Sequence, residues 1–142
     1  MTVKEFLLQP KHITHRIEQL KILKESYEEL ANSIPGGNYD QPVVQKTRNL
    51  EAPFVKWIDK IMEVEKKIAD AEVELNKVNA AVISAIEAIP NLDYQNVLTL
   101  RYINMCTWEE ICSALYISKQ TGYRWHWDAI NQISLPKKVE SS

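Results

Sequence analysis

The chain has 142 residues, of which 45% are hydrophobic and 25% charged, as in a folded protein of one domain or a small domain with an appendage. Its net charge of −2 gives no overall attraction to nucleic acid or to anionic membranes. The N-terminus lacks a basic start followed by an apolar core, and no apolar run reaches the roughly 20 residues of a membrane span. We therefore expect a cytoplasmic protein with no secretory signal and no membrane partner.

The first predicted element is an amphipathic helix. Its apolar residues recur at steps of three and four, which places them in one stripe: Ile13, Ile17, Leu20, Leu23, Tyr27, Leu30 and Ile34. Pro10 is expected near the helix start, where a missing amide costs little. The run PGGNYDQP predicts that the helix ends near Ser33 or Ile34 and that a long loop follows over about 35–53.

A second and longer helix is predicted from about Phe54 to Ile89. A three-four rhythm again runs through its apolar residues: Ile58, Ile61, Ile68, Leu75, Val78, Val82, Ile86 and Ile89. A long helix with a narrow apolar stripe needs a partner, which can be the first helix folded back, another subunit, or both. Segment 1–89 is thus predicted to be an antiparallel, coiled-coil-like helical hairpin that acts as an oligomerisation arm, with a dimer favoured.

Pro90 interrupts this pattern, and three shorter helices are predicted over 90–135, before a tail at 136–142. Asn91 is the expected N-cap of the first of them. The predicted fold class is therefore all-α, with a long helical hairpin followed by a C-terminal trihelical unit.

The last two helices of this unit carry strong start signals. Thr107 is followed three positions later by Glu110, the pattern of a capping box, and the helix WEEICSAL comes next. The residues YI predict a tight corner, and Ser118 is the expected cap of KQTGYRWHWDAINQI. This order is the layout of a helix-turn-helix, in which the N-terminal residues of the second helix enter the major groove of DNA.

The last helix has two faces by three-four spacing. The inner face is expected to hold Gly122, Trp125, Ala129, Ile130 and Ile133. The candidate DNA-binding residues are Lys119, Gln120, Thr121, Tyr123, Arg124 and Trp127. Gln120 can bond bidentately to adenine, and Lys119 or Arg124 can reach guanine or phosphate. Tyr123 can donate a hydrogen bond to phosphate.

Charge argues against DNA binding by a single copy. After Pro90 the chain has as many acidic as basic residues, so one protomer would bind nucleic acid weakly. Dimerisation would double the contacts. From spacing alone, a unit that packs against another protein is as good an interpretation as a unit that binds DNA.

A resemblance favours DNA. The stretch LTLRYINMCTWEEICSALYISKQTGYRWHWDAI resembles the fourth region of bacterial sigma factors. It is most similar to small phage proteins with a sigma-like C-terminal domain, akin to late-gene activators of the RinA and ArpU type. The matching positions are Leu100 to Tyr102, Thr107 to Ile111, Ser118, Tyr123, Arg124, His126 and Ala129. This chain departs at Gly122, where those proteins have Val or Ile, and at Cys112, where they have Ala.

The resemblance implies a DNA-binding regulator of phage or prophage transcription in a bacterial host cell, with double-stranded DNA as partner. Two alternatives stay open. The protein could be an adapter that binds RNA polymerase or a phage component without specific DNA contact. It could also be the small DNA-recognition subunit of a phage terminase, for which a ring of many subunits is expected instead of a dimer.

No other chemistry is predicted. His12 and His15 lie three apart but lack a third metal ligand, and the two cysteines lack zinc-site spacing. Cys106 and Cys112 are expected to be reduced, with Cys112 buried. No catalytic motif is present, so we expect no enzyme, no cofactor and no metal.

Overall fold

The protein is all-α. The computed structural model describes residues 1–33 and 44–136, and for 44–53 it describes the helical backbone alone. In chain order the elements are α1 (Val3–Asn32), α2 (Val44–Glu87), α3 (Leu92–Leu98), the π-helix η2 (Thr99–Ile103), α4 (Trp108–Leu115) and α5 (Lys119–Gln132).

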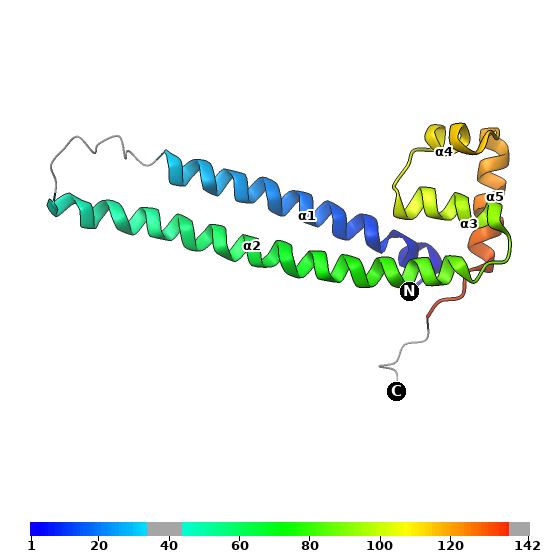
Figure 1. The fold of residues 1–142 in the computed structure, drawn as a ribbon, viewed down its shortest axis with the longest axis horizontal. Coiled ribbons are helices and arrows are strands. Elements are labelled where there is room, and N and C mark those ends of the chain that lie inside the picture. Colours follow the sequence, from blue (N-terminus) through cyan, green and yellow to red (C-terminus); the bar gives the residue numbers. More distant parts are fainter. Residues whose placement is uncertain (34–43, 137–142) are drawn as a thin grey trace. The chain divides into compact units, whose positions relative to one another are not determined.

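The chain divides into two compact units. The first joins Met1–Thr14 to the chain from Glu74 onward, and the second is His15–Val73. In each unit a part of α1 runs antiparallel to a part of α2 (Figure 1). The predicted helical hairpin and the three short helices after it are therefore confirmed.

Helix α1 begins earlier than the sequence predicted. Thr2 and Glu5 form a reciprocal cap: the Thr2 amide donates to Glu5 Oε1 at 2.8 Å, and the Glu5 amide donates to Thr2 Oγ1 at 3.1 Å. Pro10 consequently lies inside the helix and not near its start, so that prediction was wrong. An interior proline costs a helix roughly 3 kcal/mol. Burial of the preceding Phe6 and Leu7 in the core offsets this cost.

Helix α2 also begins earlier than predicted, at Val44 instead of near Phe54. The loop expected over about 35–53 is therefore wrong for 44–53, which are helical, while 34–43 lie outside the described residues. The sequence over 44–53 lacks the apolar periodicity on which the prediction relied. None of the helices described in the structure is long and apolar enough to cross a bilayer.

The core of the first unit joins both ends of the chain. Its buried residues come from α1, α2 and the C-terminal helices: Phe6, Leu7, Val82, Ile86, Ile89, Leu98, Tyr102, Ala129, Ile130 and Ile133. The N-terminal turns of α1 thus pack in the same core as α5. This shared core fixes the first residues of the chain beside the helix-turn-helix.

The first short helix changes its hydrogen-bonding pattern midway. Asn91 caps α3 as predicted, its side chain accepting a hydrogen bond from the Tyr94 amide. After Leu98 the chain continues as the π-helix η2, which carries Arg101 and Tyr102. The sequence predicted one continuous helix here, because side-chain periodicity does not report a local change of pitch.

In the second unit the two helices pack through both aromatic and ionic contacts. Tyr27 of α1 stacks on Trp57 of α2 with ring centroids 5.7 Å apart, and Lys24 Nζ lies 3.1 Å from a carboxylate oxygen of Glu65. The apolar stripe of α1 is covered in part. Ile17 is buried, whereas Leu23 and Leu30 are 40% and 43% exposed.

Candidate functional site

Helix α4 starts where the sequence predicted. The Thr107 amide donates to Glu110 Oε1 at 2.8 Å, and the Glu110 amide donates to Thr107 Oγ1 at 3.2 Å, which completes the capping box. Helix α4 then covers Trp108–Leu115, the WEEICSAL segment. Because both caps use side chains of the same turn, the start of this helix is set locally.

The corner between α4 and α5 is tight. Tyr116 has φ 58° and ψ 48°, the left-handed conformation, and the next amide, of Ile117, donates to the Cys112 carbonyl at 3.1 Å. Ser118 Oγ then accepts from the Thr121 amide at 3.1 Å and caps α5. Tyr116 is 93% exposed, so an aromatic ring projects from this corner.

Helices α4 and α5 approach each other closely at Gly122. A Cβ at this position would lie 3.3 Å from Cys112 Sγ, 3.6 Å from Ile117 Cδ1 and 3.7 Å from Trp108 Cζ3. The neighbouring atoms belong to the preceding helix and the corner, so Gly122 sets the packing of the helix-turn-helix pair.

The two faces of α5 separate as expected from spacing. Gly122, Ala129, Ile130 and Ile133 are buried and Trp125 is half-buried. The outward face consists of exposed residues at successive turns: Gln120, Tyr123, Arg124, Trp127 and Asn131. Asn131 was missed by sequence reasoning, although it follows Trp127 by four positions and Arg124 by seven, the same helical spacing.

Two of the candidate DNA-binding residues, Lys119 and Thr121, have hydrogen-bonded partners within the protein. Thr121 is half-buried, and its Oγ1 accepts a hydrogen bond from Ser118 Oγ at 3.0 Å. Lys119 Nζ lies 2.8 Å from Glu109 Oε2 of α4. This pairing raises the pKa of Lys119 and lowers the pKa of Glu109, mainly through the shared hydrogen bond. Both side chains are exposed, so the pair stabilises the fold little but offsets the positive charge at the start of α5.

The aspartate of α5 has a partner as well. Tyr94 of α3 donates its hydroxyl hydrogen to Asp128 Oδ2 at 3.3 Å. This contact joins α3 to α5 on the side of α5 that carries Thr121. An acidic residue in the helix is thus explained by a contact within the trihelical unit.

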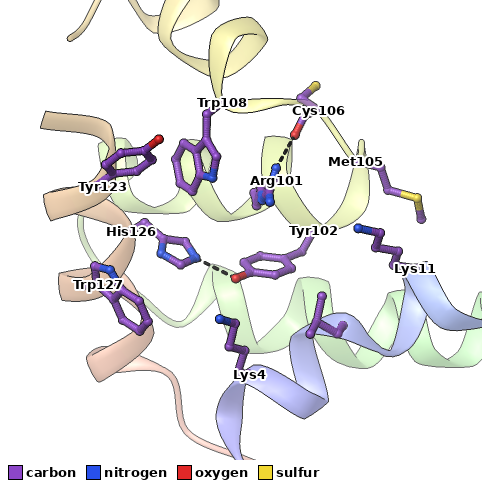
Figure 2. A pocket seen from close by; sticks show the side chains of 11 residues that line it. Lys4, Lys11, Arg101, Tyr102, Met105, Cys106, Trp108, Tyr123, His126 and Trp127 are labelled. Carbon is purple, nitrogen blue, oxygen red and sulfur yellow. Dashed lines mark hydrogen bonds between the residues drawn. The ribbon is translucent and has the colours of Figure 1, made fainter. Parts of the chain in front are cut away.

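An aromatic cluster lies along the opposite side of α5. The Trp108 ring meets Tyr123 edge-on at 4.9 Å and His126 edge-on at 5.2 Å, and His126 meets Trp127 at 5.2 Å (Figure 2). Trp127 is 53% exposed, as its placement on the outward face requires. The cluster therefore links the inside of the unit to its surface.

His126 occupies the centre of this cluster. Its Nε2 lies 2.6 Å from the Tyr102 hydroxyl, in a hydrogen bond whose donor depends on the imidazole tautomer. Burial, followed by the charges of Arg101 and Lys4, lowers the pKa of His126 to about 4. Burial likewise raises the pKa of Tyr102. Both groups are accordingly neutral near pH 7, and His126 is part of the packed edge of the core.

Two cations beside the cluster were not found from the sequence. Lys4 Nζ lies 5.5 Å from the centre of the Trp127 ring, and Arg101 Cζ lies 5.0 Å from the centre of the Trp108 ring. Arg101 also donates to the Cys106 carbonyl at 3.0 Å. Lys4 is separated from α5 by more than a hundred residues, and no local pattern indicates that the N-terminal turn packs there.

Metal ligands are not gathered in the described part of the chain, where no three His, Cys, Asp or Glu side chains are grouped. His12 and His15 are both exposed on α1. Cys106 and Cys112 are free thiols. Both are half-buried, so the prediction of a buried Cys112 was too strong.

The architecture defines an all-α protein with a long helical hairpin and a C-terminal helix-turn-helix arrangement. The chain belongs to the DUF1492 family, described as a protein of unknown function, whose model matches residues 43–134. The match begins just before α2 and ends just after α5, so it includes the whole helix-turn-helix. Comparison with curated proteins and with solved structures gives no match.

Proposed function

We propose that the protein is a DNA-binding regulator of phage transcription in which α5 lies in the major groove. The observation that carries this proposal is the pair of capped helices α4 and α5, packed closely at Gly122, with polar and aromatic side chains along the outward face of α5. Such a pair presents the N-terminal half of its second helix to base edges. The resemblance to sigma region four and to activators of the RinA and ArpU type supports the same function.

The roles on the outward face follow from side-chain chemistry. Gln120 and Arg124 are exposed one turn apart, where an amide suits adenine and a guanidinium suits guanine. Tyr123 donates to phosphate. Lys119 contributes less than its charge suggests, since contact with DNA would compete with Glu109. Trp127 contacts the sugar–phosphate edge or the methyl group of thymine with its exposed ring.

The N-terminal turns of α1 improve the charge balance of this surface. Lys4 and Lys11 are exposed and line a pocket together with Trp127, so they add positive charge beside α5. Cations next to the groove-binding helix strengthen binding through the phosphates, independently of sequence. Residues from the other end of the chain thus partly compensate for the lack of net positive charge in the trihelical unit.

Oligomerisation through the arm is the second part of the proposal. In the unit of residues 15–73, several apolar side chains of α2 are exposed: Phe54, Val55, Met62 and Val73. Leu23 and Leu30 of α1 are also exposed. Long helices that leave apolar residues uncovered are typical of helices that pair with a second copy. A dimer would present two copies of α5 to two half-sites.

Selection of bound fragments from phage genomic DNA tests this function. A regulator should enrich fragments that share a sequence, and its affinity for them should exceed that for random duplex DNA. If random DNA binds equally at every salt concentration and no fragment is enriched, the regulator is excluded. If the protein binds RNA polymerase and no DNA fragment is enriched, it is instead an adapter. If it forms a ring of many subunits, it is instead a terminase component.

A further inference from the structure

A pocket of about 430 Å³ lies beside the outward face of α5, within the unit that joins the first residues to the C-terminal helices. Three cationic side chains line it, Lys4, Lys11 and Arg101, and within the described chain no carboxylate does. A cavity with three positive charges and no lining acid attracts an anion.

Most of the remaining wall is aromatic, and Leu8, Met105 and Cys106 complete it. Its aromatic lining residues are Tyr102, Trp108, Tyr123, His126 and Trp127. Figure 2 shows Lys4 and Lys11 extending from α1 toward these rings. Two of the cations lie over indoles, Lys4 over Trp127 and Arg101 over Trp108. The pocket therefore offers planar apolar surfaces and positive charges within one small space.

The floor of the pocket has an unusual backbone. The π-helix η2 carries Arg101 and Tyr102, and Met105, which also lines the pocket, has a positive φ of 58°. π-helical turns and left-handed non-glycine residues are uncommon and cost free energy, and both are concentrated at functional sites. Hydrogen bonds within the protein hold this backbone in place, including that from Arg101 to the Cys106 carbonyl.

We propose that this pocket binds one nucleotide, whose base stacks on the exposed indole of Trp127 and whose phosphate lies among Lys4, Lys11 and Arg101. Stacking on aromatic side chains together with cations for the backbone is how proteins hold unpaired nucleotides. The volume is within the range of small-ligand pockets. An inorganic anion would use the cations but leave the aromatic wall without a role.

The nucleotide can come from two sources, a free mononucleotide or an unpaired position in a strand. Binding a nucleotide from either source would be separate from the recognition of duplex DNA, because Gln120 and Arg124 do not line the pocket. Trp127 belongs both to the pocket and to the outward face of α5. An occupant would therefore sit next to DNA held by α5.

Isothermal titration calorimetry on the full chain tests the proposal with four probes: AMP, adenosine, inorganic phosphate and a short single-stranded oligonucleotide. AMP should bind more tightly than adenosine or phosphate, and it should quench tryptophan fluorescence. The double variant Lys4→Gln/Lys11→Gln should weaken binding by about tenfold or more. Trp127→Leu should weaken binding and reduce the quenching. The matched control is Lys66→Gln/Lys67→Gln, which removes two exposed lysines from α2.

Binding of the oligonucleotide without AMP, weakened by the same variants, would support the proposal and identify a strand as the source. The proposal is overturned if neither AMP nor oligonucleotide binds, if phosphate binds as well as AMP, or if the pocket and control variants bind alike. Arg124→Ala separates this result from the proposed regulator function. That variant should lose duplex binding and keep AMP or oligonucleotide binding.

Discussion

His126 shows how one residue of α5 combines burial with a polar contact. The imidazole is 5% exposed, bonded to Tyr102 and surrounded by the rings of Trp108 and Trp127. Its neighbours Arg101 and Lys4 are cations, so a proton on His126 would meet both desolvation and repulsion. The neutral form is therefore part of the native packing of the trihelical unit.

This arrangement predicts a loss of stability in mild acid. The pKa of His126 is about 4 in the folded protein, below its ordinary value of 6.5, so the unfolded chain binds the proton first. The free energy of unfolding should be level above pH 6.5 and fall as the pH drops toward 4, by up to about 3 kcal/mol. Urea denaturation across this range measures it. In His126→Gln the free energy of unfolding should not fall in this way. An unchanged fall in that variant would show that His126 is not its cause.

Tyr116, at the corner between α4 and α5, has a left-handed backbone and an exposed ring. Its left-handed backbone costs a residue with a Cβ about 1 kcal/mol, and its exposed ring gains little from packing. Tyr116→Gly should therefore raise the free energy of unfolding by up to about 1 kcal/mol. Tyr116→Ala removes the same ring but keeps the strain and should not raise it. Equal effects of the two variants would show that the backbone strain is absent.

Packing of α4 on α5 depends on a complementary pair. The resemblance to sigma-like phage proteins implies Val or Ile at the position of Gly122 and Ala at the position of Cys112. The Cys112 sulfur occupies the space beside Gly122, 3.3 Å from a built Cβ. The larger residue at 112 thus fills the volume that the smaller residue at 122 leaves.

Gly122→Val should consequently destabilise the protein by roughly 1–3 kcal/mol, because it overfills this space. Adding Cys112→Ala should recover part of the loss, since the sulfur is removed from the crowded position. Thermal unfolding of the two single variants and the double variant measures the coupling. Additive effects would mean that the two residues do not share one space.

Local signals explain which elements could be predicted. Asn91, Thr107 and Ser118 cap their helices as the sequence indicated, because each cap is made by residues within one turn. The cap made by Thr2 and Glu5 has the same pattern as the one at Thr107, although Pro10 by itself indicates a later helix start. The π-helix has no comparable signal in side-chain spacing.

The candidate site was predictable only where it lies on a single helix. Helical spacing placed Gln120, Tyr123, Arg124 and Trp127 on one exposed face of α5. The pairing of Lys119 with Glu109 spans two helices. The positions of Lys4 and Lys11 depend on packing between the two ends of the chain. No single-sequence pattern contains such tertiary information.

The helical arm is expected to join two copies of the protein. Leu23 and Met62 are 40% and 60% exposed on α1 and α2, so a charge at either position is tolerated in a monomer. Leu23→Glu/Met62→Glu should lower the molecular mass seen by sedimentation equilibrium while leaving the helix content unchanged. Lys66→Glu is the control for an added acidic residue. A monomeric wild type, or a variant with unchanged mass, would contradict oligomerisation through this surface.

The outward face of α5 is proposed to read duplex DNA. Fluorescence anisotropy with a selected duplex tests it most directly, on wild type, Gln120→Ala and Arg124→Ala, with the exposed Gln19→Ala and Lys67→Ala as controls. Loss of a base contact should cost ~1–3 kcal/mol of specific binding while the free energy of unfolding and the oligomeric state stay unchanged. Unchanged affinity in both α5 variants, or equal losses in the controls, would contradict the claim.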